Sequence, residues 1–264
     1  MTNGSFPGER GFGSARLSIM NARSPDLLPQ QIVVHLHSFP LSRYIPPRRR
    51  GPPFVSPSGT SLDEYCDMSE DGWLTACPAD GLSAGRLLLI RASVADLDEL
   101  VEAVDTSRDH LRPWMPWAKN DPSDSVAAFL GAADGGWDTR REFAYVMRLV
   151  GTSGIVGCCG LHARIGQGAL EIGYWVHVNH TGTGLGTSAA AALTDAALHL
   201  PGVDRVEIRC DAANTVSASI PRRLGFSLER IELMEPEAPR ETGELMVWIR
   251  YRDERRRHSP QVAT

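Results

Sequence analysis

A glycine-rich turn between a strand-like segment and an alanine-rich helix is the feature that most constrains the fold of this chain. Residues 171–178 are mostly apolar, residues 179–188 carry glycine at positions 182, 184 and 186, and alanines dominate the helix expected over 185–199. Glycine lets other groups approach the backbone, and the N–H groups that begin a helix attract negative charge. The turn therefore predicts an anion cradle, with a plain loop as the alternative. It lacks the Gly-Lys-Ser/Thr of a nucleotide-binding P-loop.

The segments around this turn alternate between helical and strand periods. Helices are expected from Val94 to Val104, from Pro122 to about Gly131 or Gly135, over 185–199 and over 214–224. Strands are expected over 86–91, 142–150, 154–162, 169–178, 205–210, 226–235 and 243–251. Short glycine-containing connections at 151–154 and 166–168 indicate antiparallel pairs. Residues 86–252 thus predict an α+β domain with a mixed, mostly antiparallel central sheet of about seven strands flanked by helices.

The first 67 residues have a different composition. They hold nine of the 18 prolines and a run of three arginines at 48–50, and they show no sustained helical or strand period. Such a segment buries too little apolar surface to offset its ordering entropy, which predicts a disordered leader. One alternative is that translation starts at Met68, and another is that the arginine run docks a partner. Residues 68–85 are expected to be a linker and 253–264 a flexible tail.

Charge and cysteine content exclude several classes of protein. The net charge is −5, and no apolar stretch approaches the roughly 18 residues that a membrane span requires, so neither nucleic acid nor membrane is an expected partner. No secretory signal is visible, which predicts a cytoplasmic protein. The five cysteines include no Cys-x-x-Cys pair, and Cys158 and Cys159 would point to opposite faces of a strand. We therefore expect the cysteines to be buried free thiols, with a structural zinc site as the alternative. A homodimer is also possible on this sequence.

A second motif reduces the ambiguity of the glycine turn. Residues 214–226 read Asn-x-x-Ser-x-x-Ile-x-x-Arg-Leu-Gly-Phe. This run and the glycines at 182, 184 and 186 resemble two successive motifs of the GNAT acyltransferases. Residues 110–117, with Leu-x-Pro-Trp at 111–114, make the chain most similar to the ribosomal-protein alanine N-acetyltransferase branch (RimJ/RimL type). The resemblance covers about residues 86–252 and departs from the family pattern at Thr181, where Gln or Arg is usual.

This resemblance implies acetyl-CoA as co-substrate and no metal. Its diphosphate would lie on backbone N–H groups of the turn, at Thr183, Gly184, Leu185, Gly186, Thr187 and Ser188. The pantetheine arm would follow the backbone of Trp175, Val176, His177 and Val178, in a slot where two parallel strands separate. Asn214 would hold the pantetheine amide, although a plain helix N-cap is the alternative.

The resemblance also implies roles in proton transfer. Glu171 would take a proton from the amine. One alternative is that Glu171 is a surface residue of its strand, and another is that the amine arrives already deprotonated. Ser217 would hydrogen-bond the departing sulfur, at a position where many relatives carry a tyrosine; no tyrosine occurs between Trp175 and Met246. Trp114 and Trp117 would line the acceptor side, with ordinary packing as the alternative.

The expected activity is acetyl-CoA-dependent N-acetylation of a primary amine, with a protein N-terminal α-amine as the acceptor. Two other classes of function remain open. One is acetylation of a small amine such as an amino sugar, a polyamine or an antibiotic. The other is a non-catalytic module that only binds acyl-CoA.

Overall fold

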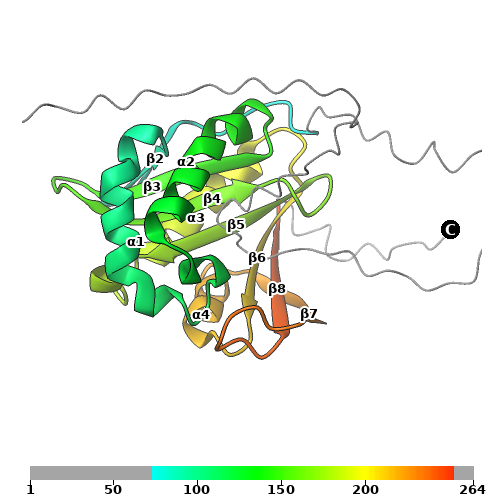
Figure 1. Ribbon diagram of the computed structural model, residues 1–264. Coiled ribbons are helices and arrows are strands. Elements are labelled where there is room, and N and C mark those ends of the chain that lie inside the picture. Colours follow the sequence, from blue (N-terminus) through cyan, green and yellow to red (C-terminus); the bar gives the residue numbers. More distant parts are fainter. Residues whose placement is uncertain (1–72, 253–264) are drawn as a thin grey trace, which may run out of the picture. The chain divides into compact units, whose positions relative to one another are not determined.

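Eight strands form one sheet in the computed structural model, which describes residues 73–252 (Figure 1). The strand order is β1-β2-β3-β4-β5-β6-β8-β7; β5 and β6 are parallel, and the other neighbours are antiparallel. The strands are β1 Gly81–Ala84, β2 Leu87–Arg91, β3 Glu142–Leu149, β4 Ile155–His162, β5 Ala169–Val176, β6 Arg205–Asp211, β7 Ser227–Leu233 and β8 Glu244–Tyr251.

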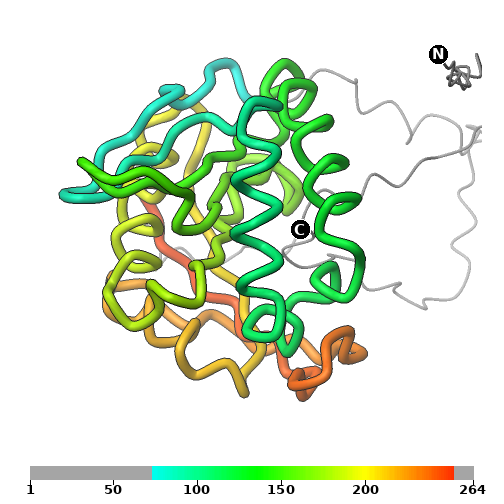
Figure 2. Tube along the Cα trace, turned by 60° about the vertical axis from the view of Figure 1, so that its left-hand side comes forward, coloured from blue at the N-terminus to red at the C-terminus, as the bar shows by residue number. Residues whose placement is uncertain are grey.

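Four α-helices cover the two faces of the sheet. They are α1 Leu97–Leu111, α2 Pro122–Asp138, α3 Leu185–His199 and α4 Thr215–Arg223, and short 3₁₀ turns η2 Val94–Asp96, η3 Pro116–Lys119 and η4 Val178–His180 connect them to their neighbours. The helices α1 and α2 lie side by side on one face (Figure 2), where they bury a core with Ala144, Val146 and Trp175. On the other face α3 packs on β4, β5 and β6, and α4 packs on α3 and β6; their core includes Phe143, Tyr145 and Ile172, together with Trp137 from the end of α2.

The alternation of side chains along each strand explains this division. Successive strand residues point to opposite faces, so Cys158 belongs to the core under α1 and α2, whereas Cys159 belongs to the core under α3. Both thiols are buried and free, as the sequence predicted. The α+β fold class and the mostly antiparallel sheet are likewise confirmed.

Two boundaries differ from the sequence prediction. The segment 68–85 was expected to be a linker, but its last part forms β1, which pairs with β2, and Leu74 is buried in the core. The helix α2 was expected to end near Gly131 or Gly135, but it continues to Asp138. Burial of Ala133 and Trp137 offsets the low helix propensity of the glycines.

Some predictions lie outside the described residues. The leader over 1–67 and the tail over 253–264 are among them. Within residues 73–252, none of the helices has both the length and the apolar content that a membrane crossing requires.

Candidate active site

The two parallel strands at the centre of the sheet separate halfway along. β5 and β6 stop pairing after Ile172 opposite Ile208, while β5 continues to pair with β4 and β6 with β8. The His177 N–H bonds to the Val156 carbonyl beyond the end of β4 pairing, at 2.9 Å. Because backbone groups alternate along a strand, those of Val176 face the gap. The expected slot between separating strands is therefore present.

Fewer residues can bind the pantetheine arm through their backbone than the sequence predicted. The His177 N–H is used within the sheet, and the Val178 N–H donates to Ser107 Oγ at 3.1 Å. Trp175 pairs with Cys158 of β4, so its backbone groups face away from the gap, and its side chain is buried in the core under α1 and α2. Of the four residues expected beside the pantetheine arm, Val176 is the one whose backbone groups remain for a ligand in the gap.

The glycine turn at the end of this slot has the geometry of an anion cradle. Gly182 and Gly184 have φ values of 72° and 85°, in the left-handed region that glycine adopts without strain, and no atom lies within 4 Å of a Cβ built on either. Gly184 is the N-cap of α3, so the N–H groups of the first turn have no carbonyl partner within the helix. The Ser188 N–H is the exception among the predicted contacts, because it bonds to the Gly184 carbonyl at 3.0 Å.

A side chain from a distant part of the sequence supports the cradle. Arg86, in the turn between β1 and β2, donates from Nη2 to the Thr183 carbonyl at 3.3 Å. Its positive charge lies beside a turn that lacks the usual Gln or Arg at Thr181, whose own hydroxyl donates to the Val178 carbonyl at 3.0 Å. The sequence held no signal for this contact, because 97 positions separate the two residues.

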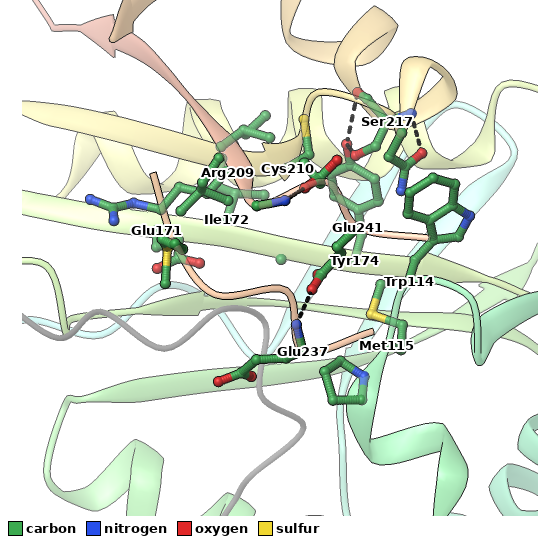
Figure 3. A pocket seen from close by; sticks show the side chains of 18 of the residues that line it. Trp114, Met115, Glu171, Ile172, Tyr174, Arg209, Cys210, Ser217, Glu237 and Glu241 are labelled. Atoms are coloured by element: carbon green, nitrogen blue, oxygen red, sulfur yellow. Dashed lines mark hydrogen bonds between the residues drawn. The ribbon is translucent and has the colours of Figure 1, made fainter. Parts of the chain in front are cut away.

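A pocket opens where β5 and β6 separate, and four of the predicted site residues line it: Trp114, Glu171, Asn214 and Ser217 (Figure 3). Its lining comes from five parts of the chain. These residues are Trp114, Met115 and Pro116; Glu171, Ile172, Gly173 and Tyr174; Ile208, Arg209, Cys210 and Asp211; Asn214 and Ser217; and Met234, Glu235, Glu237, Glu241, Gly243 and Leu245.

Glu171 reaches the pocket from β5 as a buried, ion-paired carboxylate. It is 2% exposed and receives two hydrogen bonds from Arg164, at 3.1 and 2.9 Å. Burial raises the pKa of Glu171, while the charges of Arg164 and His162 oppose the rise. A carboxylate with a raised pKa is a better proton acceptor near neutral pH than an exposed one. The ion pair with Arg164 was not foreseen from the sequence.

Asn214 and Ser217 meet at the start of α4. Asn214 Oδ1 accepts a hydrogen bond from the Ser217 N–H at 3.1 Å, so the N-cap alternative is realised. This cap uses the amide oxygen and not the amide nitrogen, and Asn214 also lines the pocket. The Ser217 hydroxyl lies 3.1 Å from the hydroxyl of Tyr174 on β5. Tyr174 also lines the pocket, and the sequence predicted no role for it.

The two tryptophans expected at the acceptor side have different environments. Trp114 lines the pocket. Trp117 is 5% exposed and packs against Trp175 in the core under α1 and α2, with ring centroids 6.4 Å apart. The packing alternative therefore describes Trp117. In the segment 73–252, no three His, Cys, Asp or Glu side chains are grouped so that they could hold a metal ion.

Comparisons with known proteins agree with this geometry. The family model of an acetyltransferase (GNAT) domain matches residues 86–227, just over half of the chain. The Bacillus subtilis protein YdaF, named provisionally as a ribosomal N-acetyltransferase, is 28% identical over 137 residues, covering 50% of this chain and 72% of YdaF.

Two solved structures share the fold. RimL, a ribosomal L7/L12 α-N-protein acetyltransferase solved with coenzyme A, has a TM-score of 0.59 at 18% identity, covering 65% of this chain and 97% of RimL. The microcin C7 self-immunity acetyltransferase MccE, solved with acetyl-CoA and AMP, has a TM-score of 0.57 at 19% identity, covering 63% of this chain and 93% of MccE. With the family match over residues 86–227, the separated strands and the glycine cradle, the chain belongs to the GNAT acetyltransferase family, whose co-substrate is acetyl-CoA.

Proposed function

We propose that this protein transfers the acetyl group of acetyl-CoA to the α-amine of a protein N-terminus. The observation that carries the proposal is that Glu171, Asn214 and Ser217 line one pocket at the gap between β5 and β6. Glu171 comes from β5, Asn214 and Ser217 come from the start of α4, and Trp114 lines the same pocket.

The residues present fit acetyl-CoA as a co-substrate. Backbone N–H groups from Thr183 to Thr187 would bind the diphosphate, and the backbone of Val176 would bind the pantetheine arm, as an added strand does. The free side-chain nitrogen of Asn214 would donate to a pantetheine carbonyl. Acetyl-CoA supplies a thioester whose carbonyl carbon an amine can attack directly, so the protein has to align the two reactants and manage protons.

Glu171 and Ser217 divide the proton management between them. Glu171, whose pKa burial raises, would accept the proton that the attacking amine loses, and Arg164 would keep its carboxylate in place. Ser217 would donate a hydrogen bond to the sulfur as its bond to the acetyl carbon breaks. Such a bond to a charged acceptor contributes roughly 1.5–3 kcal/mol.

The preference for a protein N-terminus rests on the relatives, and two segments of the chain frame the pocket that would receive it. RimL is described as an α-N-protein acetyltransferase, and the name of YdaF indicates a ribosomal substrate. In this chain Trp114 and Met115 form one side of the pocket and the β7–β8 connection forms the other. A hydrogen bond joins the two sides: the Arg240 N–H, in the β7–β8 connection, donates to the Pro113 carbonyl, next to Trp114, at 3.0 Å.

A small cationic amine is the second candidate acceptor. Three carboxylates of the β7–β8 connection, Glu235, Glu237 and Glu241, line the pocket, and negative charge attracts a polyamine or an amino sugar. MccE is an immunity acetyltransferase with the same fold.

A cytoplasmic location is part of the proposal, because new protein N-termini and acetyl-CoA are both found there.

One experiment separates these acceptors. The full chain and acetyl-CoA are incubated with peptides that begin with alanine, serine or methionine, with the same peptides blocked at the N-terminus, and with spermidine and glucosamine. Release of coenzyme A is followed, and mass spectrometry locates the acetyl group. The proposal expects acetylation of free N-termini and none of blocked peptides. Turnover with spermidine or glucosamine alone would support the second candidate, and no turnover with any amine would support a binding module.

Substitution of Arg86 is expected to weaken cofactor binding modestly. Arg86→Gln removes an exposed charge beside the cradle, and exposed charges of this kind contribute up to about 1 kcal/mol. We expect the Kd of acetyl-CoA to rise about two- to fivefold at low salt, with a smaller change at high salt because ions screen the charge. Titration calorimetry at two salt concentrations measures this. Arg91→Gln, at the other end of β2, is the matched control, and an equal effect there would contradict a role for Arg86.

A further inference from the structure

We infer that Tyr174 positions the Ser217 hydroxyl for the reaction: its phenol donates a hydrogen bond to Ser217 Oγ, which directs the Ser217 proton toward the sulfur of the departing coenzyme. This inference rests on the proposed function, in which Ser217 contacts that sulfur. Tyr174 acts through Ser217 and is therefore a positioning residue.

The contact joins β5 and α4 at the pocket. Tyr174 lies on β5, beside Glu171 and Ile172 in the lining, and Ser217 lies on α4, 43 positions later. The phenol oxygen is 3.1 Å from Ser217 Oγ and 3.5 Å from the Ser217 carbonyl oxygen, so the hydroxyl is the better partner by distance. Figure 3 shows this contact at the edge of the pocket, with Glu171 on another side of it.

The chemistry of the two hydroxyls decides which of them donates. A phenol is far more acidic than an alcohol and is the stronger hydrogen-bond donor. Burial also raises the pKa of Tyr174, so the phenol keeps its proton at any working pH. If Tyr174 donates, the Ser217 proton is left to point elsewhere, and a chain of two donors is stronger than one alone.

A sulfur atom already lies within reach of the Ser217 hydroxyl. Cys210 lines the same pocket, and a hydrogen bond from Ser217 opposes the rise that burial causes in the pKa of the Cys210 thiol, to about 11. At neutral pH Cys210 is therefore an uncharged thiol, a weak acceptor. A thiolate brought to the pocket would compete with it for the Ser217 proton.

The proton balance of the reaction needs no proton from Tyr174. The amine nitrogen forms a bond to the acetyl carbon; the carbon–sulfur bond then breaks, its electron pair goes to sulfur, and the Ser217 O–H stabilises the resulting thiolate by a hydrogen bond. The amine has meanwhile given one proton to Glu171. Glu171 returns that proton to solvent, and the released thiolate takes one from solvent, so both side chains end as they began.

A double-mutant cycle tests the inference with acetyl-CoA and the peptide that the wild type acetylates fastest. We expect Tyr174→Phe to lower kcat by up to about tenfold, the upper end of the net value of one neutral hydrogen bond, with the KM for acetyl-CoA within about twofold. Because Tyr174 acts through Ser217, the same substitution in a Ser217→Ala background should lower kcat less than about twofold. A tenfold loss that persists in that background would overturn the inference.

The matched control is Tyr145→Phe. Tyr145 is a buried tyrosine of the sheet, whereas Tyr174 is half-buried, and the Tyr145 hydroxyl donates to the Ala79 carbonyl at 2.8 Å, away from the pocket lining. This variant is expected to keep the wild-type kcat. An equal fall in kcat for both tyrosine variants would mean a general loss of packing and would also overturn the inference.

A binding measurement separates this inference from the proposed function, because it needs no acceptor. The Kd of coenzyme A is compared with that of desulfo-coenzyme A at pH 7 and at pH 9.5, where much of the thiol is ionised. In the wild type, coenzyme A should bind more tightly than desulfo-coenzyme A, and the ratio of the two Kd values should be larger at pH 9.5 than at pH 7. In Tyr174→Phe this increase of the ratio with pH should be severalfold smaller. An unchanged pH dependence in the variant would overturn the inference even if acetyl transfer is confirmed.

Discussion

Replacing Gly184 by aspartate is expected to raise the Kd of acetyl-CoA by about a hundredfold or more. The new carboxylate would lie within the cradle, and two charges about 5–6 Å apart repel by roughly 3 kcal/mol at an effective dielectric constant of about 20. The fold should survive, because no atom lies within 4 Å of a Cβ at this position and aspartate tolerates left-handed backbone better than most residues. Titration calorimetry measures the loss.

Two variants separate charge from shape in this prediction. Gly184→Asn has nearly the same volume without the charge, so it should weaken binding much less. Gly202→Asp places an aspartate at a glycine of similar φ, 80°, beyond the far end of the 15-residue helix α3, about 20 Å away. It should bind acetyl-CoA like the wild type. Unchanged binding in Gly184→Asp would show that the diphosphate lies elsewhere.

Substitution of Glu171 by glutamine is expected to lower kcat by roughly 10²–10⁴-fold, the usual cost of removing a general base. The Kd of acetyl-CoA should stay near the wild-type value, because the shape of the pocket is kept. In the wild type, kcat should fall as the pH drops through the pKa of Glu171, which burial raises above the value of an exposed glutamate. This acidic limb should be absent in Glu171→Gln.

Glu207→Gln is the control for the loss of a buried ion pair. Glu207 stands opposite Glu171 on β6, is 1% exposed and pairs with Arg205 and Arg209, but it does not line the pocket. Its substitution should destabilise the fold while keeping the acidic limb of the pH profile. If Glu171→Gln keeps the wild-type kcat and pH profile with a true acceptor, the amine arrives deprotonated and alignment alone drives the reaction.

Local sequence signals predicted most of the fold. The glycine N-cap of α3, the hairpin glycines and the alternating strands specify their own backbone, so the sheet and four helices were expected at nearly the observed positions. The two errors, at β1 and at the end of α2, occurred where contacts between residues distant in sequence determine the secondary structure. β1 is four residues long and half exposed, so it carries little pattern, and the far end of α2 persists because Trp137 packs on Phe143 and Tyr145.

The site was predictable in its motifs and less so in its contacts. The resemblance to the family motifs indicated Glu171 and Ser217 as candidates, but the partners Arg164 and Tyr174 depend on how β5 meets its neighbours. Trp114 and Trp117 are three positions apart, and the sequence could not tell which of them faces the pocket.

A crystal structure of the full chain with coenzyme A bound tests the central claim most directly. The account predicts diphosphate oxygens about 2.7–3.2 Å from backbone nitrogens between Thr183 and Thr187, the pantetheine arm beside Val176, and the sulfur within hydrogen-bonding distance of Ser217 Oγ. Coenzyme A bound outside the gap between β5 and β6, or with its sulfur remote from both Ser217 and Glu171, would contradict the account.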